Sequence, residues 1–158
     1  MIARAAPRVV AVSIPGVPVA QGRGRAVRFG NSVRVIDPSK SRSWKGAAQV
    51  FMLQARQAAG MHAPHTEPLR LVIDAYWPRP KSTPKRAPAG AIPRPSRPDA
   101  DNVAKAVMDA GNGILWADDS LVVDLVVRKW VHAAGGEPRV EVTAETCCDR
   151  PATGKEAM

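Results

Sequence analysis

Residues 78–98, PRPKSTPKRAPAGAIPRPSRP, constrain the fold most strongly, because they contain seven prolines. Proline has no backbone N–H and its ring clashes with the preceding helical turn, so neither a helix nor a central strand can run through this segment. The 60 residues that follow are few for a second domain. The sequence therefore predicts a single domain over residues 1–146, with a long basic loop at 78–98 and a polar C-terminal tail at 147–158.

The segments around this loop show the periodicities of strands and helices. Valine-rich or alternating runs predict four strands, at residues 8–14, 69–77, 121–131 and 139–145. A hairpin is predicted at 25–36, where Gly30 and Asn31 suit a two-residue turn. Helices are predicted at 41–59 and 101–113. Together these elements predict an α+β fold, in which a small mixed, largely antiparallel sheet packs against two helices.

The first predicted helix has start and stop signals and an apolar stripe. Ser41 or Ser43 suits its first turn, and Gly60 suits its end. The stripe that should face the core consists of Trp44, Ala47, Ala48, Phe51, Ala55 and Ala58.

Charge is distributed unevenly along the chain. Residues 1–98 contain 17 Lys and Arg against 3 Asp and Glu, whereas residues 99–158 contain 6 against 11. A basic surface beside an acidic centre favours a polyanionic partner, and nucleic acid fits better than a membrane, because no basic amphipathic helix and no apolar run of about 20 residues is present. A solvated basic face is the alternative. The candidate DNA-binding residues are Arg23, Arg25, Arg28, Arg34, Lys81, Lys85, Arg86, Arg94 and Arg97.

The acidic centre is the stretch RPDADNVAKAVMDAGNGILWADD, residues 97–119. Asp99 and Asp101 follow an Arg-Pro pair that favours extended backbone, in which side chains two apart project to the same side. Asp101 is also placed to cap the helix that follows. Lys105 and Asp109 then share a face of that helix, one turn apart.

Several carboxylates in close proximity repel one another unless a cation offsets their charge. Oxygen ligands without a matching cysteine or histidine point to a hard ion such as Mg²⁺ or Mn²⁺, which suits phosphodiester hydrolysis. Each acid also has a purely structural interpretation, as a helix cap, a helix ion pair or a turn residue. His62 and His65 lack further ligands nearby in the sequence and are predicted to be surface histidines.

The combined motif resembles the signature of the RusA family of Holliday junction resolvases, small endonucleases often carried by phages and prophages. The matching features are D-x-D-N at residues 99–102, a lysine four residues after the second Asp, DA at 109–110, and DD four residues before VVD. The resemblance implies that Asp99, Asp101 and Asp119 bind metal and that Lys105 is catalytic. Asp118 is a further candidate ligand, and Asn102 and Asp109 are implied as supporting residues.

The family resemblance implies a Mg²⁺-dependent homodimer that resolves four-way DNA junctions by paired symmetric nicks in recombination and repair, with Mn²⁺ able to substitute. The site should then lie where the 101–113 helix and the 121–131 strand begin, and the helix at 41–59 and the hairpin are candidate dimer surfaces. The protein is expected in the cytoplasm of a bacterial or phage-infected cell. Two alternatives stay open: a nuclease that prefers flaps or forks, and a non-catalytic protein that binds branched DNA.

Overall fold

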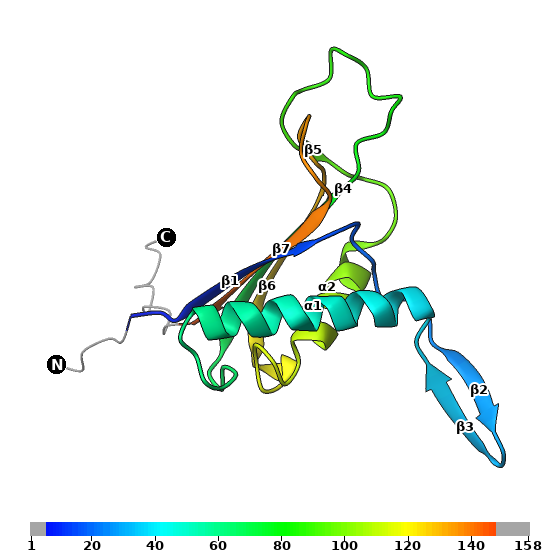
Figure 1. The fold of residues 1–158 in the computed structure, drawn as a ribbon, viewed down its shortest axis with the longest axis vertical. Coiled ribbons are helices and arrows are strands. Elements are labelled where there is room, and N and C mark those ends of the chain that lie inside the picture. Colours follow the sequence, from blue (N-terminus) through cyan, green and yellow to red (C-terminus); the bar gives the residue numbers. More distant parts are fainter. Residues whose placement is uncertain (1–5, 148–158) are drawn as a thin grey trace, which may run out of the picture.

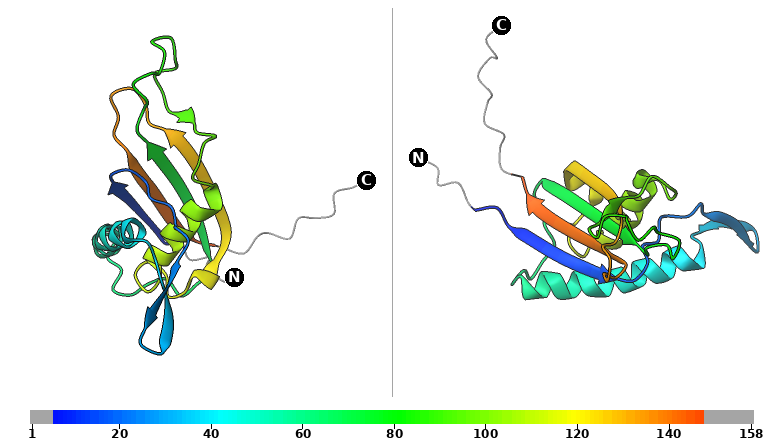
Figure 2. Two further views of the ribbon diagram at one scale, coloured as in Figure 1. Left: turned by 90° about the vertical axis from the view of Figure 1, so that its right-hand side faces the viewer. Right: turned by 90° about the horizontal axis from the view of Figure 1, so that it is seen from above.

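The computed structural model describes residues 6–147 and consists of one five-stranded sheet, a separate two-stranded ribbon and two helices (Figures 1 and 2). The strands of the sheet are β1 (Val9–Pro15), β4 (Leu69–Trp77), β5 (Ile92–Pro93), β6 (Val122–Val131) and β7 (Arg139–Thr146). The ribbon is formed by β2 (Arg25–Phe29) and β3 (Ser32–Ile36). The helices are α1 (Ser39–Ala58) and α2 (Ala100–Gly111), and a single 3₁₀ turn, η1 (Asp119–Leu121), precedes β6.

The strand order in the sheet is β1-β7-β4-β6-β5, and β4 is its centre. β4 pairs antiparallel with β7 and parallel with β6, while the β1–β7 and β5–β6 pairs are antiparallel. A parallel pair requires a long crossover, and here the crossover consists of the 78–98 loop followed by α2. The predicted α+β class with a mixed, largely antiparallel sheet is confirmed.

The core lies between one face of the sheet and the two helices. Alternation along β4 places Leu69, Leu71, Ile73 and Ala75 on the covered face, each with no exposed surface, whereas the residues between them are half-buried or exposed. The helices contribute Trp44, Ala48 and Met52 from α1 and Val103, Val107 and Ala110 from α2. The core thus fixes α2 against β6, and this packing positions the acidic segment.

The buried stripe of α1 differs from the predicted one. Ser41, Trp44, Ala48 and Met52 are buried, and Ala47 and Ala58 are exposed, so the prediction was wrong for these two alanines. Counting alanines as core residues caused the error, because small side chains are tolerated on either face of a helix. The cap also differs: Pro38 precedes the helix without a side-chain capping bond. Inside the helix, Ser41 Oγ accepts from Gly22 N and donates to Ala20 O, both at 3.2 Å.

His65 is buried, with 1% of its surface exposed, so the prediction that it is a surface histidine was wrong. Its backbone N donates to Leu115 O and its backbone O accepts from Ala117 N, both at 2.9 Å. This pairing connects the segment before β4 with the segment before β6. A long-range backbone pairing of this kind leaves no signal in the local sequence.

We expect the free energy of unfolding to fall as the pH drops below the ordinary histidine value of 6.5. Burial, aided by the charge of Arg8, lowers the pKa of His65 in the folded state, so the unfolded state takes up the proton first. For one such group, the slope of the free energy of unfolding against pH should not exceed about 1.4 kcal/mol per pH unit. Urea denaturation of the wild type and of His65→Phe between pH 5 and 7 tests this: the variant should lose most of the slope, and an unchanged slope would contradict the assignment.

No helix in the described part of the chain is long and apolar enough to cross a membrane. Apart from Cys147, the predicted polar tail lies outside the described residues.

Candidate functional site

The start of α2 holds the first two acids of the predicted cluster. Asp99 is the residue before the helix, in extended conformation (φ −71°, ψ 152°), and its backbone O accepts from Val103 N at 3.3 Å. Its side chain makes no capping hydrogen bond, and Asp101 lies in the first helical turn instead of at the cap position predicted for it. Both residues are exposed. The two carboxylates therefore point away from the core at the N-terminus of a helix, where the helix dipole favours negative charge.

The chain that leads into Asp99 is held by a lysine from the sheet. Lys129 of β6 donates from Nζ to Ser96 O at 3.0 Å and to Pro98 O at 2.7 Å. An ammonium that binds two main-chain carbonyls fixes the path of the backbone, because each bond is charge-assisted. On the other side, Gln21 N donates to Asn102 O at 3.0 Å. The first turn of α2 is thus anchored from two directions.

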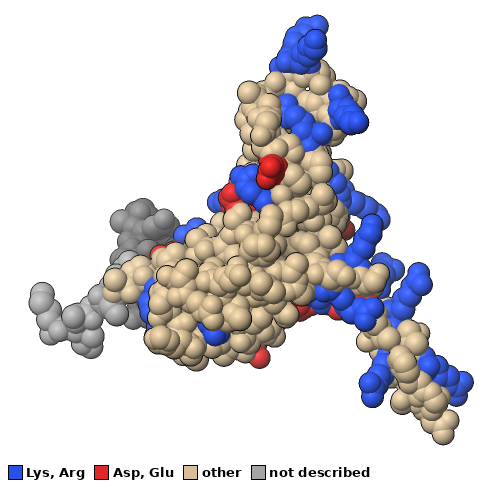
Figure 3. Space-filling view, in the orientation of Figure 1, with Lys and Arg blue, Asp and Glu red and all other residues tan. Residues whose placement is uncertain are grey.

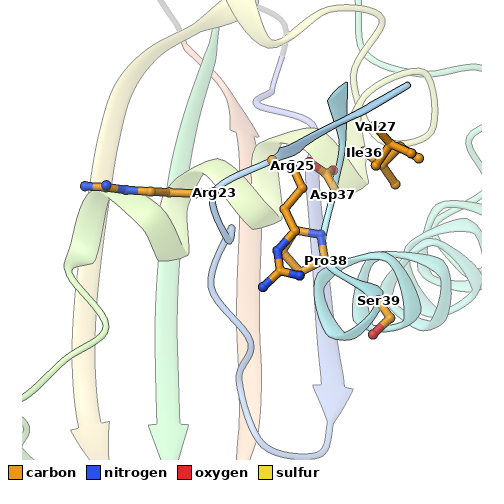
Figure 4. Close-up of a pocket in the computed structure, with 8 residues that line it drawn as sticks. Arg23, Arg25, Val27, Ile36, Asp37, Pro38 and Ser39 are labelled. Atoms are coloured by element: carbon orange, nitrogen blue, oxygen red, sulfur yellow. The ribbon is translucent and has the colours of Figure 1, made fainter. Parts of the chain in front are cut away.

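Lys105 lies one turn after Asp101 and is exposed. It borders a hollow of about 290 Å³ that is also lined by Gln21, Arg23, Asp37 and Asn102. In Figure 4, Arg23 extends along α2 towards the beginning of the helix, and Arg25 extends in a different direction, beside Pro38. Lys105 and Arg23 therefore place positive charge around this hollow, beside Asn102 of the first turn of α2.

Asp109 forms its ion pair with Lys45 of α1, at 3.6 Å, and not with Lys105, which shares its helix face. Lys45 also binds Asp37 at 2.6 Å, and Gln21 Nε2 donates to Asp37 Oδ1 at 2.8 Å. The hydrogen bond from Lys45, followed by that from Gln21, lowers the pKa of Asp37. This network connects α1 to α2 and keeps the Asp37 carboxylate ionised beneath the ribbon.

Asp118 and Asp119 form the second part of the acidic cluster, in the segment before β6. Asp118 caps η1, because its side chain accepts from Ser120 N at 2.8 Å, and hydrogen bonding to Ser120 lowers its pKa. Asp119 is the first residue of η1 and is half-buried. Since η1 packs against α2, the two acidic positions belong to neighbouring elements.

Within residues 6–147, no three His, Cys, Asp or Glu side chains are arranged as a group that could hold a metal ion. The predicted convergence of Asp99, Asp101 and Asp119 is therefore not present in this structure. The oxygen-only donor chemistry of Asp99 and Asp101 nevertheless fits Mg²⁺, which usually keeps several waters and takes one or two carboxylates from the protein.

The 78–98 loop is an ordered projection, which is held by its own arginine. Arg79 donates to Pro88 O at 2.5 Å, to Gly90 O at 3.2 Å and to His132 O at 3.4 Å. The Arg79 guanidinium is occupied by these carbonyl groups. The exposed cations at the loop tip are Lys81, Lys85 and Arg86.

Arg94 and Arg97, the other predicted DNA-binding residues of the loop, lie near its base. Arg94 stacks on Trp77, 4.8 Å from the ring centroid, and donates to Arg97 O at 2.6 Å. Its backbone N also donates to Lys129 O at 2.9 Å. Arg94 therefore packs against Trp77 and holds the segment that leads into α2.

The ribbon β2–β3 is the second basic projection. Residues 23–35 are all exposed, and among them are the four predicted arginines, Arg23, Arg25, Arg28 and Arg34. In Figure 1 the ribbon and the 78–98 loop extend from the body in different directions, and Figure 3 shows basic side chains along both. The left view of Figure 2 shows α2 between the loop above and the ribbon below. The carboxylates at the start of α2 therefore lie between two basic arms.

Sequence reasoning missed four residues whose contacts hold α2 and the 78–98 loop in place: Lys45, Asp37, Arg79 and Lys129. Only Lys129 had a local signal, since a lysine within the apolar run LVVDLVVRKWV needs a polar partner.

Two comparisons with known proteins show what this chain is similar to. A family model described as "Endodeoxyribonuclease RusA" matches residues 15–145. The chain is also similar to a Bacillus subtilis (strain 168) protein named "Uncharacterized protein YqaN", with 38% identity over 139 residues, which cover 82% of this chain and 91% of the relative.

Proposed function

Because the chain belongs to the RusA endodeoxyribonuclease family, we propose that it is a Mg²⁺-dependent endonuclease that resolves four-way DNA junctions by paired symmetric nicks. The observation that carries this proposal is the position of Asp99 and Asp101, exposed at the start of α2 between two basic arms. Nucleases of this family depend on divalent metal ions.

In the proposed site Asp99 and Asp101 hold the metal ion. A bound divalent ion supplies an activated water and neutralises charge on the scissile phosphate. Asp119 would be the candidate for a third ligand, since η1 packs against α2. Asp118 is the weaker candidate, because its carboxylate already caps η1.

Lys105 supplies fixed positive charge beside the scissile phosphate. Its ammonium is exposed on the same side as Asn102 and Arg23, so it is able to meet the negative charge that develops on the phosphate oxygens. Lys129 does not touch DNA in this proposal. It positions the carboxylates, because it binds the carbonyls of Ser96 and Pro98.

The loop tip should bind DNA phosphates. Changing Lys81, Lys85 and Arg86 together to alanine is expected to weaken junction binding and to reduce the slope of log K against log salt. The reduction should be about 1 for each phosphate that is no longer neutralised, hence up to about 3. Fluorescence anisotropy at a series of salt concentrations measures both quantities. An unchanged affinity and slope would remove the loop tip from the DNA-binding surface.

The matched control for this variant is the pair Arg70→Gln and Arg128→Gln on the sheet face that no helix covers. Arg70 pairs with Asp124 at 3.3 Å and Arg128 pairs with Asp74 at 3.1 Å. Removing these charges should leave the salt slope unchanged, because neither residue lies on the basic arms.

We propose that the protein acts as a homodimer, since two symmetric nicks in a junction of two-fold symmetry require two equivalent active sites. The outer face of α1 supports a contact of this kind, because Val50 and Leu53 are 55% and 38% exposed there. Sedimentation equilibrium of the wild type and of Val50→Glu tests this surface: the variant should dissociate at concentrations at which the wild type is dimeric.

The direct test is a cleavage assay on a labelled four-way junction, a flap, a fork and a linear duplex, each with Mg²⁺ and with EDTA. We expect paired nicks in the junction in Mg²⁺ alone. Preferential cutting of the flap or fork would keep the nuclease and change the substrate. Salt-sensitive binding without cutting would identify a binding protein and reject the proposal.

A further inference from the structure

The ribbon β2–β3 leaves apolar side chains in solvent. Val27, Phe29, Val33 and Val35 are 36%, 53%, 66% and 74% exposed, and the ribbon pairs with no other strand of the described chain. An isolated two-stranded hairpin is at best marginally stable in water. Exposed apolar residues on such an arm indicate a surface that is covered in the functional state.

The charge of the ribbon identifies the partner that covers it. Residues 23–36 contain four arginines and no acid. The cross-strand pairs place Val27 beside Arg34 on one face and Val33 beside Arg28 on the other, so each face alternates apolar and cationic groups. Its partner must therefore present anionic edges together with apolar surface. DNA presents both where base pairs are unstacked at a branch, and a two-stranded ribbon is narrow enough to enter a DNA groove.

Phe29 is placed at the tip of this arm. It is the last residue of β2, directly before Gly30, whose φ of +59° forms the turn. Ser32 Oγ donates to Phe29 O at 3.0 Å and fixes the turn, and the guanidinium of Arg34 lies 6.0 Å from the centre of the ring. An aromatic ring at the tip of a projecting arm, with arginines on the neighbouring positions, has the arrangement of a wedge residue that enters a base step while cations hold the flanking phosphates.

We propose that Phe29 inserts between bases at the branch point of the DNA substrate and that Arg28 and Arg34 hold the phosphates on either side of it. The proposal rests on the proposed function, since it makes the ribbon the element that distinguishes branched DNA from linear duplex. Stacking on Phe29 stabilises the complex only where the stack is already interrupted, because an intact duplex must first be unstacked.

The test compares Phe29→Ala, Phe29→Trp and Val9→Ala in an Asp101→Asn background, which is expected to remove cleavage. Val9 is the control, because it is an exposed apolar residue, 48% exposed, that lies on β1 and outside the ribbon. Anisotropy with a four-way junction and a linear duplex of the same sequence gives the two dissociation constants. A junction with 2-aminopurine at the branch reports unstacking by its fluorescence.

We expect Phe29→Ala to weaken junction binding by about 5- to 150-fold, the range given by the loss of one stacked base, and to abolish the rise in fluorescence. Duplex binding should change less than about twofold, and Phe29→Trp and Val9→Ala should behave like the parent protein. The proposal would be overturned if Phe29→Ala weakened binding to the junction and to the duplex equally, or weakened neither. A change in sedimentation on Phe29→Ala in the absence of DNA would also overturn it, because the ribbon would then contact a second copy.

Cleavage by the protein with its natural Asp101, measured with and without the Phe29→Ala substitution, separates this proposal from the proposed function. If the wild type cuts junctions and Phe29→Ala cuts them with unchanged affinity and rate, the wedge is rejected and the nuclease stands. If the wild type neither binds nor cuts any branched substrate, both proposals are rejected.

Discussion

Asp101→Asn is expected to reduce junction cleavage by at least about a hundredfold while junction binding stays equal or becomes tighter. Loss of a group that only orients a metal ligand costs about 10- to 100-fold, so loss of a ligand should cost more. Binding should not suffer, because removing a carboxylate from the DNA surface reduces its repulsion of phosphate. Single-turnover rates over a range of Mg²⁺ concentrations, with anisotropy in EDTA, measure the two effects separately.

Asp124→Asn is the control for this change. Asp124 is also an exposed carboxylate, but it lies on β6 and pairs with Arg70. We expect its removal to leave the cleavage rate within about twofold of the wild type. Cutting by Asp101→Asn at the wild-type rate would contradict the assignment of the site to the start of α2. The same change at Asp119 shows whether η1 supplies a ligand in the complex with DNA, where a loss as large as that of Asp101→Asn is expected.

Gly111→Ala is expected to cause the largest loss of stability among glycine-to-alanine substitutions in the described part of the chain. A Cβ at Gly111 would lie 2.2 Å from Trp116 Cζ2 and 2.4 Å from Cη2, and Trp116 has no exposed surface. The indole ring of Trp116 and the C-terminal turn of α2 have no space to move apart, since the core is closely packed. The cost should reach or exceed the upper end of the ~1–3 kcal/mol typical of overpacked cores. Urea denaturation followed by tryptophan fluorescence measures it.

Gly46→Ala is the matched control, because Gly46 lies within α1 and a Cβ there meets no atom within 4 Å. Alanine in place of glycine in an exposed helix stabilises by about 0.5–1 kcal/mol, so the two substitutions should have opposite signs. Equal effects would show that helix propensity, and not the contact with Trp116, determines the result. Gly111→Ala should also slow cleavage, because Trp116 belongs to the segment that leads to Asp119.

The sequence predicts well those elements whose apolar residues or turn residues form a regular local pattern. The alternation in LRLVIDAYW determines both the strand and its buried face, and Gly30-Asn31 determines the turn of the ribbon. The D-x-D-N motif, with a lysine one turn later, determines that two carboxylates and a cation lie on the first turns of a helix. These features depend on neighbours within a few residues, so the sequence alone contains the information for them.

The partners of the charged side chains were decided by the tertiary structure alone. Asp109 pairs with Lys45, which is 64 positions earlier in the sequence, because α1 packs across α2. Lys129 reaches the carbonyls of Ser96 and Pro98 because the parallel pairing of β4 with β6 returns the chain beside the loop. Sequence periodicity reports which face of an element is apolar, whereas the partner of a polar group depends on which elements meet. The sequence therefore determined which chemical groups the site contains, and only the packing of α2, β6 and the two basic arms decided where they lie.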